Sequence, residues 1–333
     1  MNYIGSKRKL SDFIKSSIID VVGNTENKVF AELFGGTGVV ARKFKKYVKK
    51  VIINDIEPYS YILLRNYIGN HQNFYFFDLI RELNFTPGIE GFIFHHYCQG
   101  GGQGRNYFTD ENGQRIDATR QRIEQWHRQK KINENQYYFL LASLLESADK
   151  VANTASVYGA FLKHIKDSAR KPLLIQPAVF TVNEQTHDVY NRDANELIRE
   201  IEGDILYLDP PYNARQYGAN YHLLNTIALY DKFDPRGKTG LREYYRSPYC
   251  KSRRVVEVFE DLIANARFEY VFVSYNNEGL MTTEQVKEIL SNYGEYHLIV
   301  RPYQRFRADK PENRLHKADA TEEYLHVLHK KMG

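Results

Sequence analysis

Short apolar runs that end in polar turns recur in the first third and in the last two fifths of the chain, and they predict buried strands. The clearest runs are residues 29–34 (VFAELF), 51–55 (VIIND), 204–208 (DILYL) and 268–275 (FEYVFVSY). Apolar runs of this kind are typical of strands that are covered on both faces, as in parallel sheets. Residues 297–300 and 324–328 are expected to close the sheet as a final strand pair.

Segments with apolar residues at helical spacing lie between these runs. They predict helices over residues 10–19, 39–47, 57–68, 195–201 and 283–292. Strands that alternate with helices predict an α/β fold with a mostly parallel central sheet. Ligands bind such sheets at the carboxyl ends of the strands, so the residues that follow each run are the first candidates for function.

Residues 85–175 break this rhythm, and we expect them to form an inserted, mainly helical lobe. Residues 1–84 and 176–333 would then form one discontinuous domain, with strands resuming at Thr181-Val182 and at residues 189–190. Inside the lobe, a glycine-rich loop at residues 100–104 and a tight turn at Asn112-Gly113 precede two expected helices, over residues 117–131 and 135–151.

The lobe carries a polar set that suits nucleic acid. Arg105, Arg115 and Arg120 occur together with Asn and Gln residues. Arginines can donate hydrogen bonds to phosphates, and amide side chains can read the edges of bases. We therefore take these three arginines as candidate DNA contacts. A scaffold or a dimerisation helix pair is the alternative interpretation.

Composition narrows the class of protein. The 333 residues are 42% hydrophobic and 26% charged, with a net charge of +5 and a pI of about 8.8. This mild basic excess is compatible with a polyanionic partner. Two cysteines suggest a reducing compartment without disulfides. We expect a cytoplasmic protein, because the amino terminus has no signal-peptide pattern and no run approaches the roughly 18 apolar residues of a membrane helix.

A metal site is not expected. His95, His96 and Cys98 are close in the sequence, but no second cysteine lies near them to complete a zinc site.

A glycine turn follows the first strand. Phe34, Gly36 and Gly38 lie between that strand and a helix, the arrangement that brings backbone amides against a nucleotide-type cofactor. Asp55 ends the next strand, where an acid can accept the hydroxyls of a ribose, or alternatively cap the following helix. Asp193 lies at another strand end and is a candidate acceptor for a cofactor's adenine amino group; a capping role is again the alternative.

The sequence Asp209-Pro210-Pro211-Tyr212 follows the central predicted strand. The Asp209 carboxylate and the Pro210 carbonyl can accept both N–H bonds of an exocyclic amine, while Tyr212 stacks on the base. An ordinary Pro-Pro turn with a solvated acid is the alternative. The polar segment that follows alternates basic residues with tyrosines, which favours a loop over a nucleic acid strand rather than a merely solvated loop. Its candidate DNA contacts are Arg215, Tyr217, Arg246, Arg253 and Arg254.

Together and in this order, the motifs resemble the D12 class of DNA adenine-N6 methyltransferases, the Dam-like enzymes. Residues 3–7 (YIGSK) resemble the amino-terminal cofactor motif of that class, and residues 32–38 resemble its F-x-G-x-G motif, with Glu32 where the class usually has Asp. Asn54-Asp55, Asp193 and residues 209–212 match the ribose acid, the adenine acid and the catalytic motif. Ala194 follows Asp193 where Phe is common, and residues 274–276 resemble a later active-site strand.

The resemblance implies a Rossmann-like class I methyltransferase fold and S-adenosylmethionine as the cofactor. Tyr3, Lys7, Asp55 and Asp209 would contact this cofactor, and the lobe before the catalytic strand would be the target-recognition domain. The implied reaction methylates N6 of an adenine flipped out of double-stranded DNA. The setting would be bacterial or phage-type, in a restriction–modification system with a cognate endonuclease or in a stand-alone system.

Two alternatives remain open beside this reaction. Cytosine-N4 methylation uses the same amine chemistry, and a non-catalytic DNA-binding module could keep the fold. Cytosine-C5 methylation is excluded, because it needs a cysteine next to a proline and neither cysteine directly follows one.

Overall fold

The computed structural model describes residues 7–276, 279–303 and 321–330. Its centre is a seven-stranded sheet in the order β3-β2-β1-β4-β5-β7-β6. All neighbours pair in parallel except β7, which runs antiparallel to both β5 and β6. The expected Rossmann-like α/β fold is thereby confirmed. The strands are β1 (Val29–Glu32), β2 (Lys50–Asn54), β3 (Asp188–Tyr190), β4 (Glu202–Leu208), β5 (Arg267–Asn276), β6 (Gly294–Tyr303) and β7 (Thr321–Lys330).

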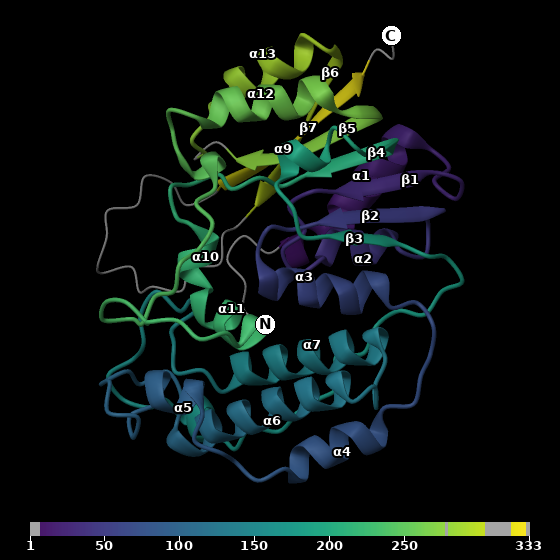
Figure 1. Ribbon diagram of the computed structural model, residues 1–333. Helices are drawn as coiled ribbons and strands as arrows, with labels where there is room; N and C mark the ends of the chain where they lie inside the picture. Colours follow the sequence, from purple (N-terminus) through teal and green to yellow (C-terminus); the bar gives the residue numbers. More distant parts are fainter. Residues whose placement is uncertain (1–6, 277–278, 304–320, 331–333) are drawn as a thin grey trace.

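Helices lie on both faces of the sheet (Figure 1). The side chains of the strands alternate between two buried clusters, one on each face. Along β4, Ile205 and Tyr207 belong to one buried cluster, while Leu206 and Leu208 belong to the other. This alternation follows from the period of two along a strand. One layer contains α1 (Ser11–Val22), α2 (Val39–Phe44) and residues of α3 (Pro58–Leu64) and of the π-helical turn η2 (Arg65–Gly69); the other contains α9 (Ala194–Leu197), α12 (Val255–Asn265) and α13 (Thr283–Ser291).

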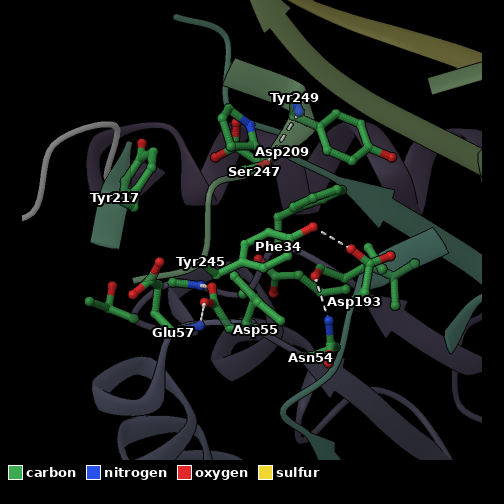
Figure 2. Close-up of a pocket in the computed structure, with 18 of the residues that line it drawn as sticks. Phe34, Asn54, Asp55, Glu57, Asp193, Asp209, Tyr217, Tyr245, Ser247 and Tyr249 are labelled. Atoms are coloured by element: carbon green, nitrogen blue, oxygen red, sulfur yellow. Dashed lines mark hydrogen bonds between the residues drawn. The ribbon is translucent and has the colours of Figure 1, made fainter. Parts of the chain in front are cut away.

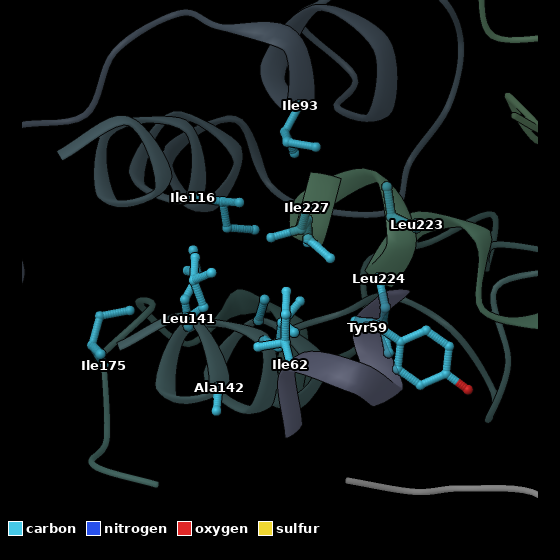
Figure 3. Close-up of a cluster of buried hydrophobic side chains, with 14 of the residues drawn as sticks. Tyr59, Ile62, Ile93, Ile116, Leu141, Ala142, Ile175, Leu223, Leu224 and Ile227 are labelled. Atoms are coloured by element: carbon cyan, nitrogen blue, oxygen red, sulfur yellow. The ribbon is translucent and has the colours of Figure 1, made fainter. Parts of the chain in front are cut away.

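A third buried cluster fills the helical lobe below the sheet (Figures 1 and 3). Figure 3 shows Ile93, Ile116 and Leu141 of the lobe together with Ile62 of α3 and Ile227 of α11. The boundaries at residues 85 and 175 stay a prediction. The lobe shares its buried cluster with α3, which precedes this range in the sequence, and with residues 222–229, which follow it. Its elements are α4 (Phe77–Phe85), α5 (Phe92–Tyr97), α6 (Asp110–Arg128), α7 (Glu134–Lys150) and α8 (Asp167–Arg170), and α10 (Tyr217–Asn220) leads into α11 (His222–Leu229).

Three local predictions were wrong. Asn112-Gly113 is not a turn but lies inside α6, because Thr109 caps that helix by accepting the Asn112 N–H at 3.2 Å. Residue 113 is glycine because a Cβ there would collide with the sulfur of Cys98. Thr181-Val182 is not in a strand, and the helix expected over residues 195–201 is the shorter α9. None of the helices that the structure describes combines the length and apolar character that a bilayer crossing requires.

Candidate active site

A cleft opens at the carboxyl edge of the sheet, next to the ends of β1, β2 and β4 (Figure 2). The empty space in the cleft, together with the open solvent at its mouth, is about 920 Å³. Five carboxylates line it, from Glu32, Asp55, Glu57, Asp193 and Asp209, against two cationic side chains, from Lys7 and Arg192. The cleft is therefore rich in acceptors.

The glycine turn between β1 and α2 is fixed by buried acids. Asp55 accepts the Gly36 N–H at 2.7 Å and, through its other oxygen, the Glu57 N–H at 2.9 Å. Glu32 accepts the Ala41 N–H at 2.9 Å in the first turn of α2. Gly38 has a φ of 70°, a left-handed conformation that suits glycine. Asp55 does not cap α3, because the N-cap of that helix is Glu57, whose side chain makes no capping hydrogen bond. The Asp55 carboxylate instead fixes the turn before the helix and lines the cleft.

Asp209 leaves β4 and pairs with the Lys7 ammonium at 3.0 Å. Lys7 also lies 3.1 Å from Glu323 of β7, so two carboxylates share one cation. Burial raises the pKa of Asp209 to about 6, although Lys7 acts against that shift. Burial lowers the pKa of Lys7, but the carboxylates of Asp209 and Glu323 outweigh it and raise that pKa well above its usual value. Lys7 is therefore charged at neutral pH, and Asp209 is mostly ionised.

Burial also raises the pKa values of other acids that line the cleft. Burial raises the pKa of Glu57 to about 7, although the amide of Asn225 donates to its carboxylate at 2.6 Å. Burial also raises the pKa of Glu32 well above its usual range, and the carboxylates of Asp209 and Asp55 add to the rise. A cationic or donor-rich ligand would relieve this crowding of acids.

Aromatic side chains line the cleft together with its acids (Figure 2). Tyr249 meets Phe34 edge-on, with ring centroids 5.0 Å apart. Tyr245 donates its hydroxyl to Asp193 at 2.6 Å. The other oxygen of Asp193 accepts the N–H groups of Asn195 and Glu196 and so caps α9. Apolar faces and a carboxylate thus meet in one corner of the cleft, where a flat heterocycle with an amino group would fit.

The structure brings most of the expected cofactor residues together. Lys7, Glu32, Phe34, Gly36, Asp55, Asp193 and Asp209 line the cleft, while Gly38 lies between the lining residues Thr37 and Val39. Pro210 is buried directly after Asp209, and the Tyr212 ring packs on the cluster beside α12, with the Lys7 ammonium 5.9 Å from its centroid. Tyr3 lies outside the described residues.

Three of the expected DNA contacts make hydrogen bonds within the protein. The buried guanidinium of Arg105 donates to the carbonyls of His96, Pro235 and Gly237. Arg120 is also buried and donates to the carbonyls of Ile227 and Ala228 at the end of α11. Half-buried Arg115 donates to the carbonyls of Leu173 and Asn84. These hydrogen bonds give the three side chains a structural role, and their contact with DNA stays a prediction.

Four of the five remaining expected DNA contacts lie at the protein surface. Arg215, Arg246, Arg253 and Arg254 are exposed, and Arg254 pairs with Glu257 at 2.9 Å. Tyr217 differs from them, because it lines the cleft (Figure 2).

Sequence reasoning missed several cleft residues. Glu57 was read only as the start of a helix, and Tyr245 and Tyr249 only as members of a basic, tyrosine-rich segment. Glu323 was not singled out, because its approach to Lys7 depends on the antiparallel pairing of β7 with β5. β7 carries other polar residues, among them Glu322, His326 and His329, so no local pattern marks Glu323.

Metal binding has no visible support in the part of the chain that the structure describes. Within residues 7–276, 279–303 and 321–330, no group of three or more His, Cys, Asp or Glu side chains is arranged to hold an ion.

Known proteins resemble this chain over nearly its whole length. Residues 3–289 match the family model of D12 class N6 adenine-specific DNA methyltransferases. The type II methyltransferase M.NlaIII of Neisseria lactamica is 60% identical over 99% of both chains. M.FokI of Planomicrobium okeanokoites is 39% identical over 99% of this chain and 53% of its own length. M.CviAII of Paramecium bursaria Chlorella virus 1 is 38% identical over 92% and 93% of the two chains.

Proposed function

Because this chain belongs to the D12 class of N6 adenine-specific DNA methyltransferases, we propose that its cleft binds S-adenosylmethionine and that Asp209 receives the N6 amine of the target adenine. The single observation that carries this proposal is the position of Asp209. Its carboxylate lines the acid-rich cleft and is held there by Lys7.

The chemistry of the cleft fits this cofactor. S-adenosylmethionine supplies an electrophilic methyl group on a positively charged sulfur, and it presents an ammonium, two ribose hydroxyls and an adenine amino group as donors. Five lining acids can accept hydrogen bonds from these donors and offset the positive charge. We assign Asp193 to the adenine amino group and Asp55, with Glu57 beside it, to the ribose hydroxyls. Phe34 supplies an apolar face for the adenine ring.

Asp209 and the Pro210 carbonyl would activate the amine by position and charge. Hydrogen bonds from both N–H groups favour a pyramidal nitrogen and stabilise the positive charge that develops on it. The pKa of about 6 keeps most of the Asp209 population ionised at neutral pH. The methyl donor needs no further activation, so holding the amine in line with it supplies much of the remaining rate.

The target adenine must leave the duplex to reach Asp209, since the carboxylate lies inside a cleft. Flipping costs a few kcal/mol. Stacking on Tyr212, worth about 1–3 kcal/mol per base, would offset part of this cost. We assign the exposed Arg215, Arg246, Arg253 and Arg254 to the phosphates of the surrounding double-stranded DNA.

We further propose that the protein serves a restriction–modification system with a cognate endonuclease. The support is that M.NlaIII, M.FokI and M.CviAII are all named type II methyltransferases.

The test is methylation of DNA with radiolabelled S-adenosylmethionine, followed by digestion to nucleosides. We expect label in N6-methyladenine. Label in N4-methylcytosine would contradict the assignment of the amine, and failure of the protein to bind S-adenosylmethionine would contradict the proposed cofactor site.

A further inference from the structure

Tyr245 makes a contact at the point where the adenine of the cofactor is expected. Its hydroxyl donates to the outward oxygen of Asp193 at 2.6 Å. Figure 2 shows this side chain reaching across the cleft to Asp193. Burial and the Asp193 carboxylate both raise the pKa of Tyr245, so the hydroxyl keeps its proton and remains the donor.

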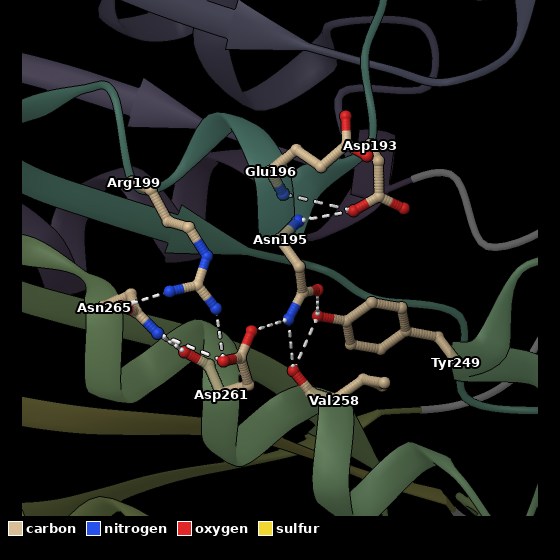
Figure 4. A network of polar contacts seen from close by, with 8 residues as sticks. All are labelled: Asp193, Asn195, Glu196, Arg199, Tyr249, Val258, Asp261 and Asn265. Carbon is tan, nitrogen blue, oxygen red and sulfur yellow. Dashed lines mark hydrogen bonds and ion pairs between the residues drawn. The ribbon is translucent and has the colours of Figure 1, made fainter.

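Asp193 does not need Tyr245 to hold its orientation. Its inward oxygen accepts the Asn195 N–H at 2.8 Å and the Glu196 N–H at 3.3 Å. The Asn195 side chain is in turn fixed to α12, where its amide donates to the Val258 carbonyl and to Asp261, both at 2.8 Å (Figure 4). Removing the tyrosine hydroxyl therefore leaves the carboxylate oriented and frees an acceptor site on it.

The chain around Tyr245 is anchored on both sides, while the tyrosine itself is 40% exposed. Upstream, Arg242 forms a two-bond ion pair with Asp231 at 3.0 and 2.9 Å. Downstream, the backbone of Ser247 exchanges two hydrogen bonds with the Gln216 side chain. Because the backbone on both sides is held in place, we expect the Tyr245 side chain to leave Asp193 by rotation about its own bonds and not by a rearrangement of the loop.

We propose that the Tyr245 hydroxyl and the amino group of the cofactor's adenine exchange at the outward oxygen of Asp193, so that Tyr245 sets how tightly the cleft holds adenosine. This inference rests on the proposed function, which assigns S-adenosylmethionine to the cleft. The methyl donor and its product carry the same adenosine, so both are released more readily when the hydroxyl returns to Asp193. Tyr245 thus weakens the binding of donor and product alike.

The test compares the Kd of S-adenosylhomocysteine for the wild type, Tyr245→Phe and Tyr244→Phe by calorimetry on the full chain. Tyr245→Phe is expected to bind about three- to tenfold more tightly, which corresponds to the loss of one competing hydrogen bond. Tyr244→Phe removes the adjacent hydroxyl, which is not in the lining of the cleft, and is expected to match the wild type.

S-inosylhomocysteine, in which an oxo group replaces the adenine amino group, distinguishes competition for Asp193 from a general change in ligand affinity. We expect Tyr245→Phe to leave its Kd unchanged. An unchanged or weaker affinity of Tyr245→Phe for S-adenosylhomocysteine, or an equal gain for both ligands, would overturn the inference. If the wild type itself failed to bind S-adenosylhomocysteine, the proposed function would fail first.

Discussion

Lys7 and Glu323 act on the charge of Asp209 in opposite directions. Lys7 lowers the pKa of Asp209 and Glu323 raises it, while burial sets the value of about 6. In the proposed reaction the ionised carboxylate accepts the amine, so the acidic limb of the kcat/KM profile is expected to report this pKa. At the residue scale, the network therefore makes a prediction about pH.

The predicted profile of kcat/KM for DNA rises through about pH 6 in the wild type, because kcat/KM reports the pKa values of the enzyme without bound DNA. Glu323→Gln removes a negative charge near Asp209, so its limb moves to lower pH. Lys7→Met removes the positive charge, so its limb moves to higher pH. The measurement is kcat/KM for DNA against pH, and shifts in the same direction would contradict the shared-cation account.

Tyr212 is predicted to act through its ring. Tyr212→Ala should raise KM for DNA more than Tyr212→Phe, because phenylalanine keeps the face on which a flipped base stacks. The expected difference is about tenfold for each 1.4 kcal/mol of stacking lost. Steady-state kinetics with a duplex substrate measures it, and equal effects of the two substitutions would exclude stacking.

At this scale the sequence predicted the acids better than their partners. Asp55, Asp193 and Asp209 were found because each follows a strand, and strand ends meet at one edge. Lys7 was assigned to the cofactor, but its nearest groups are the carboxylates of Asp209 and Glu323. Pairings of this kind join distant parts of the chain, and no local pattern encodes them.

At the scale of elements, α6 is locked onto the end of α11 by Arg120. This helix was predicted to begin at residue 117, but it begins at Asp110. Because Thr109 caps the helix there, Asn112-Gly113 lies inside it. Turn propensity was overridden by the cap and by close packing on Cys98. By contrast, α7 was predicted almost to the residue, because its apolar periodicity is continuous.

Arg120 and Arg246 are predicted to respond differently to loss of charge. Arg120→Met should lower the free energy of unfolding by about 2–4 kcal/mol, because it leaves the Ile227 and Ala228 carbonyls unpaired. Arg246→Gln should leave stability unchanged but weaken DNA binding and reduce its salt slope by about 1.

Urea unfolding and DNA titrations at several salt concentrations measure both properties on the same two variants. Loss of DNA affinity in a stably folded Arg120→Met would show that this arginine contacts DNA. An unchanged salt slope in Arg246→Gln would remove Arg246 from the interface.

At the scale of the whole molecule, the sheet and the lobe are joined by a common core. Tyr59 and Ile62 of α3 and Leu223 and Ile227 of α11 are buried in the same cluster as the lobe helices (Figure 3). The alternation of strands and helices was sufficient to predict the α/β fold. It did not reveal this shared cluster, because a hydrophobic stripe shows that a helix is covered and not which element covers it.

A fragment of residues 85–175 is therefore predicted not to fold alone. Without α3 and α11, the fragment exposes the apolar side chains that these two helices cover. A domain of this size buries only a small hydrophobic core, so the loss is large relative to its stability. Circular dichroism and thermal melting of the purified fragment provide the measurement, with the full chain as control. A cooperative transition in the fragment would show that the lobe is an independent domain.

The central claim is that the Asp209 carboxylate holds the amine that is methylated. The most direct test is single-turnover methyl transfer by Asp209→Ala, with binding of S-adenosylhomocysteine measured on the same preparation. The account predicts a rate at least about a hundredfold below the wild type, with cofactor binding weakened but measurable. A rate equal to that of the wild type would contradict it.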